Sequence, residues 1–145
     1  MSLEENKALA RRFFDAYNAN DLDAAEAMLA ENFLHNNLML PPGVPPNRTA
    51  FKQLGLMFAT AFPDHHSTIE DQVAEGNLVA TRSTFRGTHQ GELMGMPPTG
   101  KQVTFSSINI DRIENGKIVE KWEQSDLLGM MQQLGMIPSP EQVPA

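Results

Sequence analysis

Carboxylate and amide side chains gather in the last third of the chain, on two segments with strand-like alternation. An Asn-Gly turn separates residues 103–113 from residues 118–126, and this dipeptide is the strongest short-range signal for a β-hairpin. Because side chains alternate in a strand, Lys121 and Glu123 share one face of the second segment. A partly buried carboxylate there could act as a general acid or base, since burial raises its pKa toward neutrality.

Several of these residues also have a plain structural interpretation. An ion pair between Lys121 and Glu123 would explain both residues without any chemistry. Asp126 is a second candidate catalytic carboxylate, but an Asp at the start of the last helical segment is more typical of a helix N-cap. Trp122 is a candidate for the ligand site, although aromatic residues in strands usually belong to a core or an interface. Arg82 lies in mid-strand, where we expect it to be partly buried and paired with the carboxylate of Glu123 or Asp64.

The N-terminal half adds further candidates for a ligand site. Tyr17, the one Tyr of the chain, lies on the apolar face of a predicted helix and could donate to an oxyanion, or simply pack with its hydroxyl satisfied. Phe58 lies on the apolar face of a later helix and is a candidate for the pocket wall. Among the histidines, His65 is expected to be exposed, whereas His66 or His35 could reach the pocket mouth. No histidine has the spacing of a familiar zinc motif, so we expect no metal site.

The elements that must position these residues can be predicted from capping and periodicity. Helices are expected over residues 2–18, from Asp21 onward, and after Thr49 as far as Pro63, with residues 33–48 as a long loop. Period-two alternation then predicts strands before the hairpin, and a short helix follows it.

Helices followed by antiparallel strands favour an α+β domain, with the N-terminal helices packed on one side of a curved antiparallel sheet. We expect the predicted strands over residues 67–74 and 78–89, and the last helix over residues 126–134. A single domain would cover residues 1–137, followed by a loose tail over residues 138–145.

Composition excludes several classes of protein. The net charge of −7 and the scattered basic residues disfavour nucleic-acid binding. Without cysteine, the chain has neither disulfides nor thiolate metal ligands. No apolar stretch approaches the roughly 20 residues of a membrane span, and the N-terminus lacks the pattern of a secretion signal, so a cytoplasmic location is the default expectation.

Four segments of the chain carry a resemblance to a known family. They are residues 85–101, 112–122, 126–129 and 133–135. In these segments the chain resembles the SnoaL-like polyketide cyclases, or ester cyclases, of the nuclear transport factor 2-like superfamily. The resemblance implies a cone-shaped α+β barrel and a homodimer or higher homo-oligomer, but it does not specify a reaction, because this fold hosts several.

The resemblance also implies a chemistry and a set of site residues. The family's cyclases close a ring without a cofactor, by an intramolecular aldol reaction in which a carboxylate moves a proton next to a carbonyl. Glu123 matches the position of their catalytic Asp and reaches one methylene further. Their other pocket positions match His35, where they have Asn, and Ser107 and Asn109, where they have Gln and His.

Three hypotheses of function follow from the residues and the resemblance. The first is a SnoaL-like cyclase or isomerase-type enzyme, in which Glu123 transfers protons on a small, largely apolar carbonyl compound and Asn109, Ser107 or Tyr17 orients the oxygen. The second is a non-catalytic module of the same fold that binds a small molecule, with Glu123 neutralised by an ion pair. The third is hydrolysis of an epoxide or ester by activated water, with Asp64 or Asp126 joining Glu123.

Overall fold

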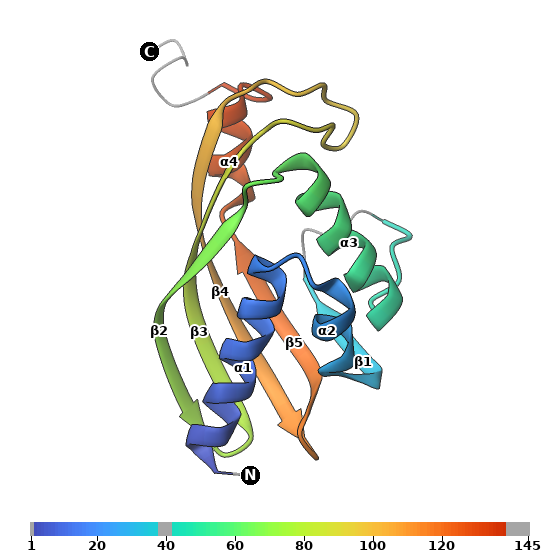
Figure 1. Cartoon of the computed structure of the whole chain (residues 1–145), viewed down its shortest axis with the longest axis vertical. Coiled ribbons are helices and arrows are strands. Elements are labelled where there is room, and N and C mark those ends of the chain that lie inside the picture. Colours follow the sequence, from blue (N-terminus) through green and yellow to red (C-terminus); the bar gives the residue numbers. More distant parts are fainter. Residues whose placement is uncertain (1, 38–41, 139–145) are drawn as a thin grey trace.

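The computed structural model describes residues 2–37 and 42–138 (Figure 1). The predicted tail over residues 138–145 therefore lies, except for its first residue, outside the described residues. The elements, in chain order, are α1 (Leu3–Asn18), α2 (Leu22–Ala27), β1 (Leu29–Asn36), α3 (Arg48–Ala61), β2 (His66–Glu75), β3 (Leu78–Thr88), β4 (Gln102–Glu114), β5 (Lys117–Ser125) and α4 (Leu127–Leu134).

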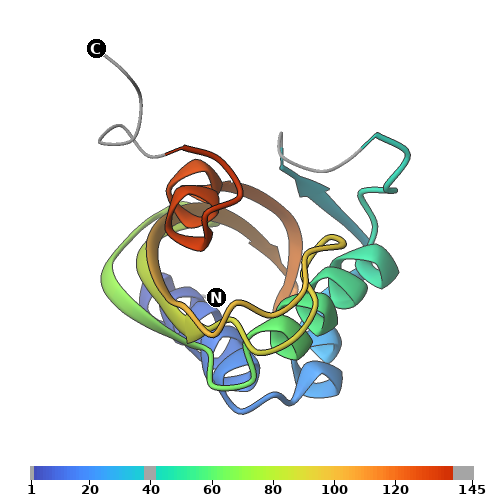
Figure 2. The same ribbon diagram turned by 90° about the horizontal axis from the view of Figure 1, so that it is seen from above.

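The strands form one curved sheet in the order β1-β5-β4-β3-β2. Helices α1, α2 and α3 lie on its concave side, and α4 lies at one end (Figure 1, Figure 2). The predicted α+β fold, with N-terminal helices packed on a curved sheet, is confirmed. The four strands from β2 to β5 pair in antiparallel fashion, but β1 runs parallel to β5, so the sheet is mixed rather than wholly antiparallel.

Strand β1 occupies part of a segment that the sequence predicts to be a loop. Phe33 and His35 are buried and Leu34 between them is exposed, which is the alternation of a strand. The prediction was wrong for residues 33–36, because the Pro- and Asn-rich residues that follow extend the loop signal backward over a short strand. The correction matters for the site, since β1 lies beside β5.

The helix boundaries follow from local capping chemistry. Ser2 and Glu5 form the predicted capping box at the start of α1, and Asp21 caps α2 through the backbone N–H of Ala24. Helix α3 begins two residues earlier than predicted, because the side chain of Asn47 provides its N-cap. No helix in the described part of the chain combines the length and the apolar character that crossing a membrane requires.

The predicted hairpin of β4 and β5 is confirmed, with Asn115 and Gly116 at φ values of 51° and 73°. Its register contains one irregularity: Arg112 pairs with Glu120, but the next residue of β4, Ile113, pairs with Ile118. The extra residue on β5 is a β-bulge, which reverses the faces on its two sides.

The bulge corrects one detail of the predicted faces. Unbroken alternation along β5 would place Ile118 and Trp122 on one face, but Ile118 is buried in the core whereas Trp122 is 40% exposed on the outer face. Beyond the bulge, the predicted alternation holds, and Lys121 and Glu123 both face the concave side.

Candidate active site

Three pairs of polar residues lie on the concave face of the β4–β5 hairpin. Each pair consists of residues directly opposite each other on the two strands, so the pairs form successive rungs of a ladder. Alternate residues of a strand are separated by roughly 6.5–7 Å, which sets the spacing between rungs. The rungs are Ser107–Ser125, Asn109–Glu123 and Asp111–Lys121.

This polar ladder forms one wall of a cavity of about 400 Å³ between the sheet and the helices. The other walls are mainly aromatic and aliphatic, and they come from α1, α3, β3 and β4. A cavity of this size with few, convergent polar groups is typical of a small-molecule site. Its lining includes Phe13, Tyr17, His35, Phe51, Phe58, Phe85, Phe105, Ser107, Asn109, Lys121 and Glu123.

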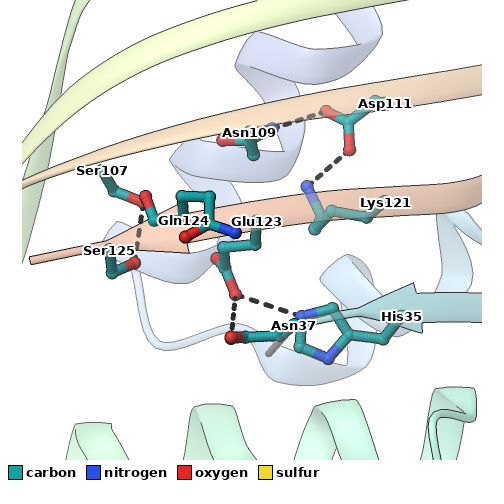
Figure 3. A network of polar contacts seen from close by, with 9 residues as sticks. All are labelled: His35, Asn37, Ser107, Asn109, Asp111, Lys121, Glu123, Gln124 and Ser125. Carbon is teal, nitrogen blue, oxygen red and sulfur yellow. Dashed lines mark hydrogen bonds and ion pairs between the residues drawn. The ribbon is translucent and has the colours of Figure 1, made fainter. Parts of the chain in front are cut away.

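Glu123 is held through one of its two carboxylate oxygens (Figure 3). Its Oε1 lies 3.1 Å from Nε2 of His35 and accepts a hydrogen bond of 3.2 Å from Nδ2 of Asn37. Its Oε2 has no hydrogen-bond partner among residues 2–37 and 42–138. Glu123 thus has one fixed oxygen and one oxygen available to a ligand.

The electrostatic surroundings keep Glu123 ionised. Burial raises the pKa of Glu123, but the hydrogen bonds from His35 and Asn37 and the positive charge of Lys121 outweigh it and lower the pKa below its ordinary value. The sequence-based expectation of a pKa raised toward neutrality is therefore wrong, because it considered burial without the donors supplied by β1.

His35 reaches Glu123 because β1 is the parallel neighbour of β5. Its imidazole is 2% exposed and is enclosed by aromatic rings, with the Phe51 ring centroid at 4.7 Å in an edge-on arrangement. The backbone N–H of His35 donates to the carbonyl of Pro46. The ring therefore has little freedom to turn away from Glu123.

Lys121 does not pair with Glu123, as the sequence suggested, but with Asp111. The Nζ of Lys121 lies 2.6 Å from Oδ1 of Asp111, and their side chains are 3% and 1% exposed. The same ammonium lies 4.8 Å from the centroid of the Phe13 ring. Oδ2 of Asp111 accepts a hydrogen bond of 3.1 Å from Nδ2 of Asn109, so this carboxylate links two rungs of the ladder (Figure 3).

Tyr17 projects from α1 into the cavity and packs closely against α3. A Cβ at Gly55 would lie 2.6 Å from the Tyr17 hydroxyl, so the absence of a side chain there makes room for the phenol. In the described residues, the hydroxyl has no hydrogen-bond partner. Burial and the negative charges of Glu123 and Glu26 raise the pKa of Tyr17 far above its ordinary value, so the hydroxyl remains a donor.

Three predicted site residues lie outside the cavity. Arg82 is on the outer face of the sheet. Its exposed side chain pairs with Asp71 at 2.6 Å rather than with Glu123 or Asp64. Trp122 is on the same outer face, because it alternates with its cavity-lining neighbours on β5. Asp126 is the N-cap of α4 and accepts from the backbone N–H of Gly129 at 2.9 Å.

The histidines after α3 are placed opposite to expectation. His66 is exposed, whereas His65 lines the cavity, with its ring stacked 6.2 Å from that of Phe85. Burial and the charge of His66 lower the pKa of His65, which favours a neutral imidazole. Asp64 accepts hydrogen bonds from the backbone N–H and the hydroxyl of Thr88, and it is not among the residues that line the cavity with Glu123.

Two polar residues of the site were not predicted as such. Asp111 is two residues from Asn109 on the same strand, so the period-two pattern already placed both on the inner face. Nothing local indicated that Asp111 would be the partner of Lys121. Asn37 follows a strand that was not recognised. Among the described residues, no three His, Asp or Glu side chains are arranged to hold a metal ion.

Comparison with known proteins identifies the class to which this fold and site belong. The family of SnoaL-like polyketide cyclases matches residues 7–134, and the chain belongs to this family. The chain is 31% identical to the aklanonic acid methyl ester cyclase DnrD of Streptomyces peucetius. The alignment spans 136 residues and covers 92% of this chain and 93% of DnrD.

Solved structures agree with this assignment. AclR of Streptomyces galilaeus, a proposed hydroxylase, is 30% identical, with a TM-score of 0.87 over 99% of this chain and 87% of AclR. IdmH of Streptomyces antibioticus, a proposed polyketide cyclase, is 34% identical, with a TM-score of 0.77 over 90% of this chain and 98% of IdmH. The homologues thus include polyketide cyclases, and one fold carries more than one proposed activity.

Proposed function

We propose that this protein is a cofactor-free cyclase that closes a ring on a small, largely apolar carbonyl compound by an intramolecular aldol reaction. One observation carries the proposal: Glu123 is fixed through Oε1 and lines the cavity, and its Oε2 has no hydrogen-bond partner among the described residues. The lowered pKa of Glu123 favours the carboxylate form. A base must be deprotonated and oriented before substrate binds, and this arrangement provides both.

In the proposed reaction, Oε2 of Glu123 takes a proton from the carbon next to a substrate carbonyl. The C–H electrons form the enolate, and its carbon attacks a second carbonyl of the same molecule to make the new C–C bond. The oxygen of that second carbonyl then receives the proton from Glu123 and becomes a hydroxyl group. No atom is gained or lost, so the reaction requires neither an oxidant nor a cofactor.

Tyr17 is the best placed of the three residues considered for orienting the reacting oxygen. The amide nitrogen of Asn109 donates to Asp111, and the hydroxyl of Ser107 is hydrogen-bonded to Ser125 and to the carbonyl of Gln124. The hydroxyl of Tyr17 is protonated and uncommitted within the described residues. A buried donor of this kind stabilises a developing enolate oxygen.

The function of the homologues supports a cyclic or cyclising substrate. DnrD is a methyl ester cyclase, and 92% of this chain aligns with it. The aromatic walls suit a flat, apolar molecule, and the polar ladder offers hydrogen-bonding groups along one wall.

Exchange of carbon-bound protons for deuterium tests the proposal without knowledge of the natural substrate. The protein is incubated in D₂O with a panel of 1,3-dicarbonyl compounds and cyclic ketones, and exchange is followed by NMR. Binding of each probe is measured in parallel by calorimetry. Catalysed exchange is the expected result, whereas probes that bind without any catalysed exchange would contradict the proposal and favour the binding module.

His35 is expected to set the lower pH limit of this exchange. The active form of Glu123 is the carboxylate, so activity is lost as the pH falls through the pKa of Glu123, which lies below its ordinary value. In His35→Phe the hydrogen bond and the positive potential of the imidazole are lost, while Lys121 remains, so this pKa should rise and the acid limb should move to higher pH.

The matched control for this prediction is His35→Asn, which keeps an N–H donor but carries no charge. It should shift the acid limb less than His35→Phe does. A uniform loss of rate at every pH in both variants, with no movement of the limb, would show that His35 acts only through packing.

We also propose a homodimer formed through the outer face of the sheet. Ile110 and Trp122 are opposite each other there, and Ile108 lies two residues away; these side chains are 38%, 40% and 53% exposed. A contiguous apolar patch on a sheet face is typical of an interface between copies.

Light scattering should give the dimer mass for the wild type and for Leu56→Asp, an exposed control on α3, but the monomer mass for Ile108→Asp. A wild-type monomer at high concentration would refute the dimer.

A further inference from the structure

The side-chain amide of Asn109 has a fixed orientation. Asn109 is 3% exposed, and the group beside it is the Asp111 carboxylate, whose other oxygen receives the ammonium of Lys121. A carboxylate in an ion pair only accepts hydrogen bonds, so the amide must turn its nitrogen, not its oxygen, toward Asp111. The buried ion pair therefore determines which end of Asn109 faces Asp111.

The oxygen of the same amide is consequently offered to the cavity. In Figure 3 it points away from Asp111, and within the described part of the chain it has no hydrogen-bond partner. Asn109 lines the cavity and is directly opposite Glu123 in the hairpin. Opposite residues on one face of an antiparallel pair have Cβ atoms about 4.5–5.5 Å apart.

Among the described residues, Oδ1 of Asn109 and Oε2 of Glu123 are therefore two uncommitted acceptors, on opposite residues of the polar wall. A substrate that placed a carbonyl oxygen or an ether oxygen against Asn109 would leave a buried acceptor facing an acceptor, which costs binding energy. A hydroxyl group in that place would donate to Asn109. Sites with a committed polar group of this kind discriminate strongly against analogues that lack the matching partner.

We infer that Asn109 is a specificity-determining residue that reads a hydroxyl group on the substrate, next to the carbon from which Glu123 removes the proton. The substrate class is then a hydroxyaryl ketone or an enolised 1,3-dicarbonyl compound. The assignment of the reacting carbon rests on the proposed function, whereas the preference for a hydroxyl group rests only on the orientation of Asn109.

Matched pairs of hydroxy-1-tetralones and their methyl ethers, with the substituent at each free aromatic position, test this inference by calorimetric binding. For at least one position, the wild type should bind the hydroxy compound about 10-fold or more tightly than its ether. In Asn109→Leu this preference should fall to about 2-fold or less. Asn36→Leu, the same substitution at a residue of β1 that does not line the cavity, is the matched control and should retain it.

The outcomes are separable. Equal binding of every hydroxy compound and its ether by the wild type would overturn the inference, and this comparison needs no variant to fold. A preference that persists in Asn109→Leu would also overturn it, because another group would then read the hydroxyl. A preference without catalysed deuterium exchange would support the inference and contradict only the proposed reaction.

Discussion

Replacement of Glu123 with Gln is expected to lower the rate of proton–deuterium exchange by about 10²–10⁴-fold, the usual contribution of a positioned general base. Gln has the shape of Glu, and its Oε1 can still accept from His35 and Asn37, which hold Oε1 of Glu123 in the wild type. Its amide nitrogen would occupy the place of Oε2 and cannot accept a proton. The loss should therefore appear in the exchange rate, with probe binding largely retained.

Glu123→Asp provides the matched control for this result. It keeps a carboxylate but shortens the side chain by one methylene, and a displacement of about an ångström can reduce the rate by roughly 10²-fold. The expected order of rates is therefore wild type, then Glu123→Asp, then Glu123→Gln. An exchange rate in Glu123→Gln within a few-fold of the wild type would remove Glu123 from the mechanism.

Replacement of Lys121 with Ala is expected to destabilise the fold by about 3–5 kcal/mol, the usual effect of removing one partner from a buried ion pair. The change would leave Asp111, which is 1% exposed, with a buried charge and without its ammonium partner at 2.6 Å. Because whole domains are stable by only about 5–15 kcal/mol, urea denaturation should detect the change readily.

The sheet supplies its own control for this prediction. Arg82 and Asp71 are also 2.6 Å apart, but on the exposed outer face, where such pairs contribute about 0–1 kcal/mol. Arg82→Ala should therefore shift the denaturation midpoint little. The double variant Lys121→Met with Asp111→Leu removes both charges and should recover much of the stability. Equal effects of Lys121→Ala and Arg82→Ala would contradict the burial argument.

The placement of Lys121 bears on the choice between an enzyme and a binding module. A direct ion pair with Lys121 or Arg82 would have supported the module, since it would commit the carboxylate of Glu123. Instead, Lys121 is committed to Asp111 and Arg82 to Asp71. Lys121 acts on Glu123 only at a distance, by lowering its pKa together with His35 and Asn37.

Local features of this protein follow from neighbouring residues alone. The Asn-Gly turn predicted the hairpin, and period-two alternation placed Asn109 and Glu123 on one face, because turn chemistry and strand geometry depend on neighbouring residues. Capping residues predicted the start of α1 and the role of Asp126 for the same reason. Family motifs spread along the chain then indicated the fold, and residues 7–134 match that family.

Which side chains meet in the site depends on the fold of the whole chain. His35 and Glu123 are 88 residues apart, and they touch only because β1 pairs in parallel with β5, which no local pattern specifies. The choice of Asp111 over Glu123 as the partner of Lys121 likewise depends on cross-strand register and burial. Long-range pairing is set by the packing of the whole sheet against its helices, so the ionisation of Glu123 and the orientation of Asn109 emerge only in the folded protein.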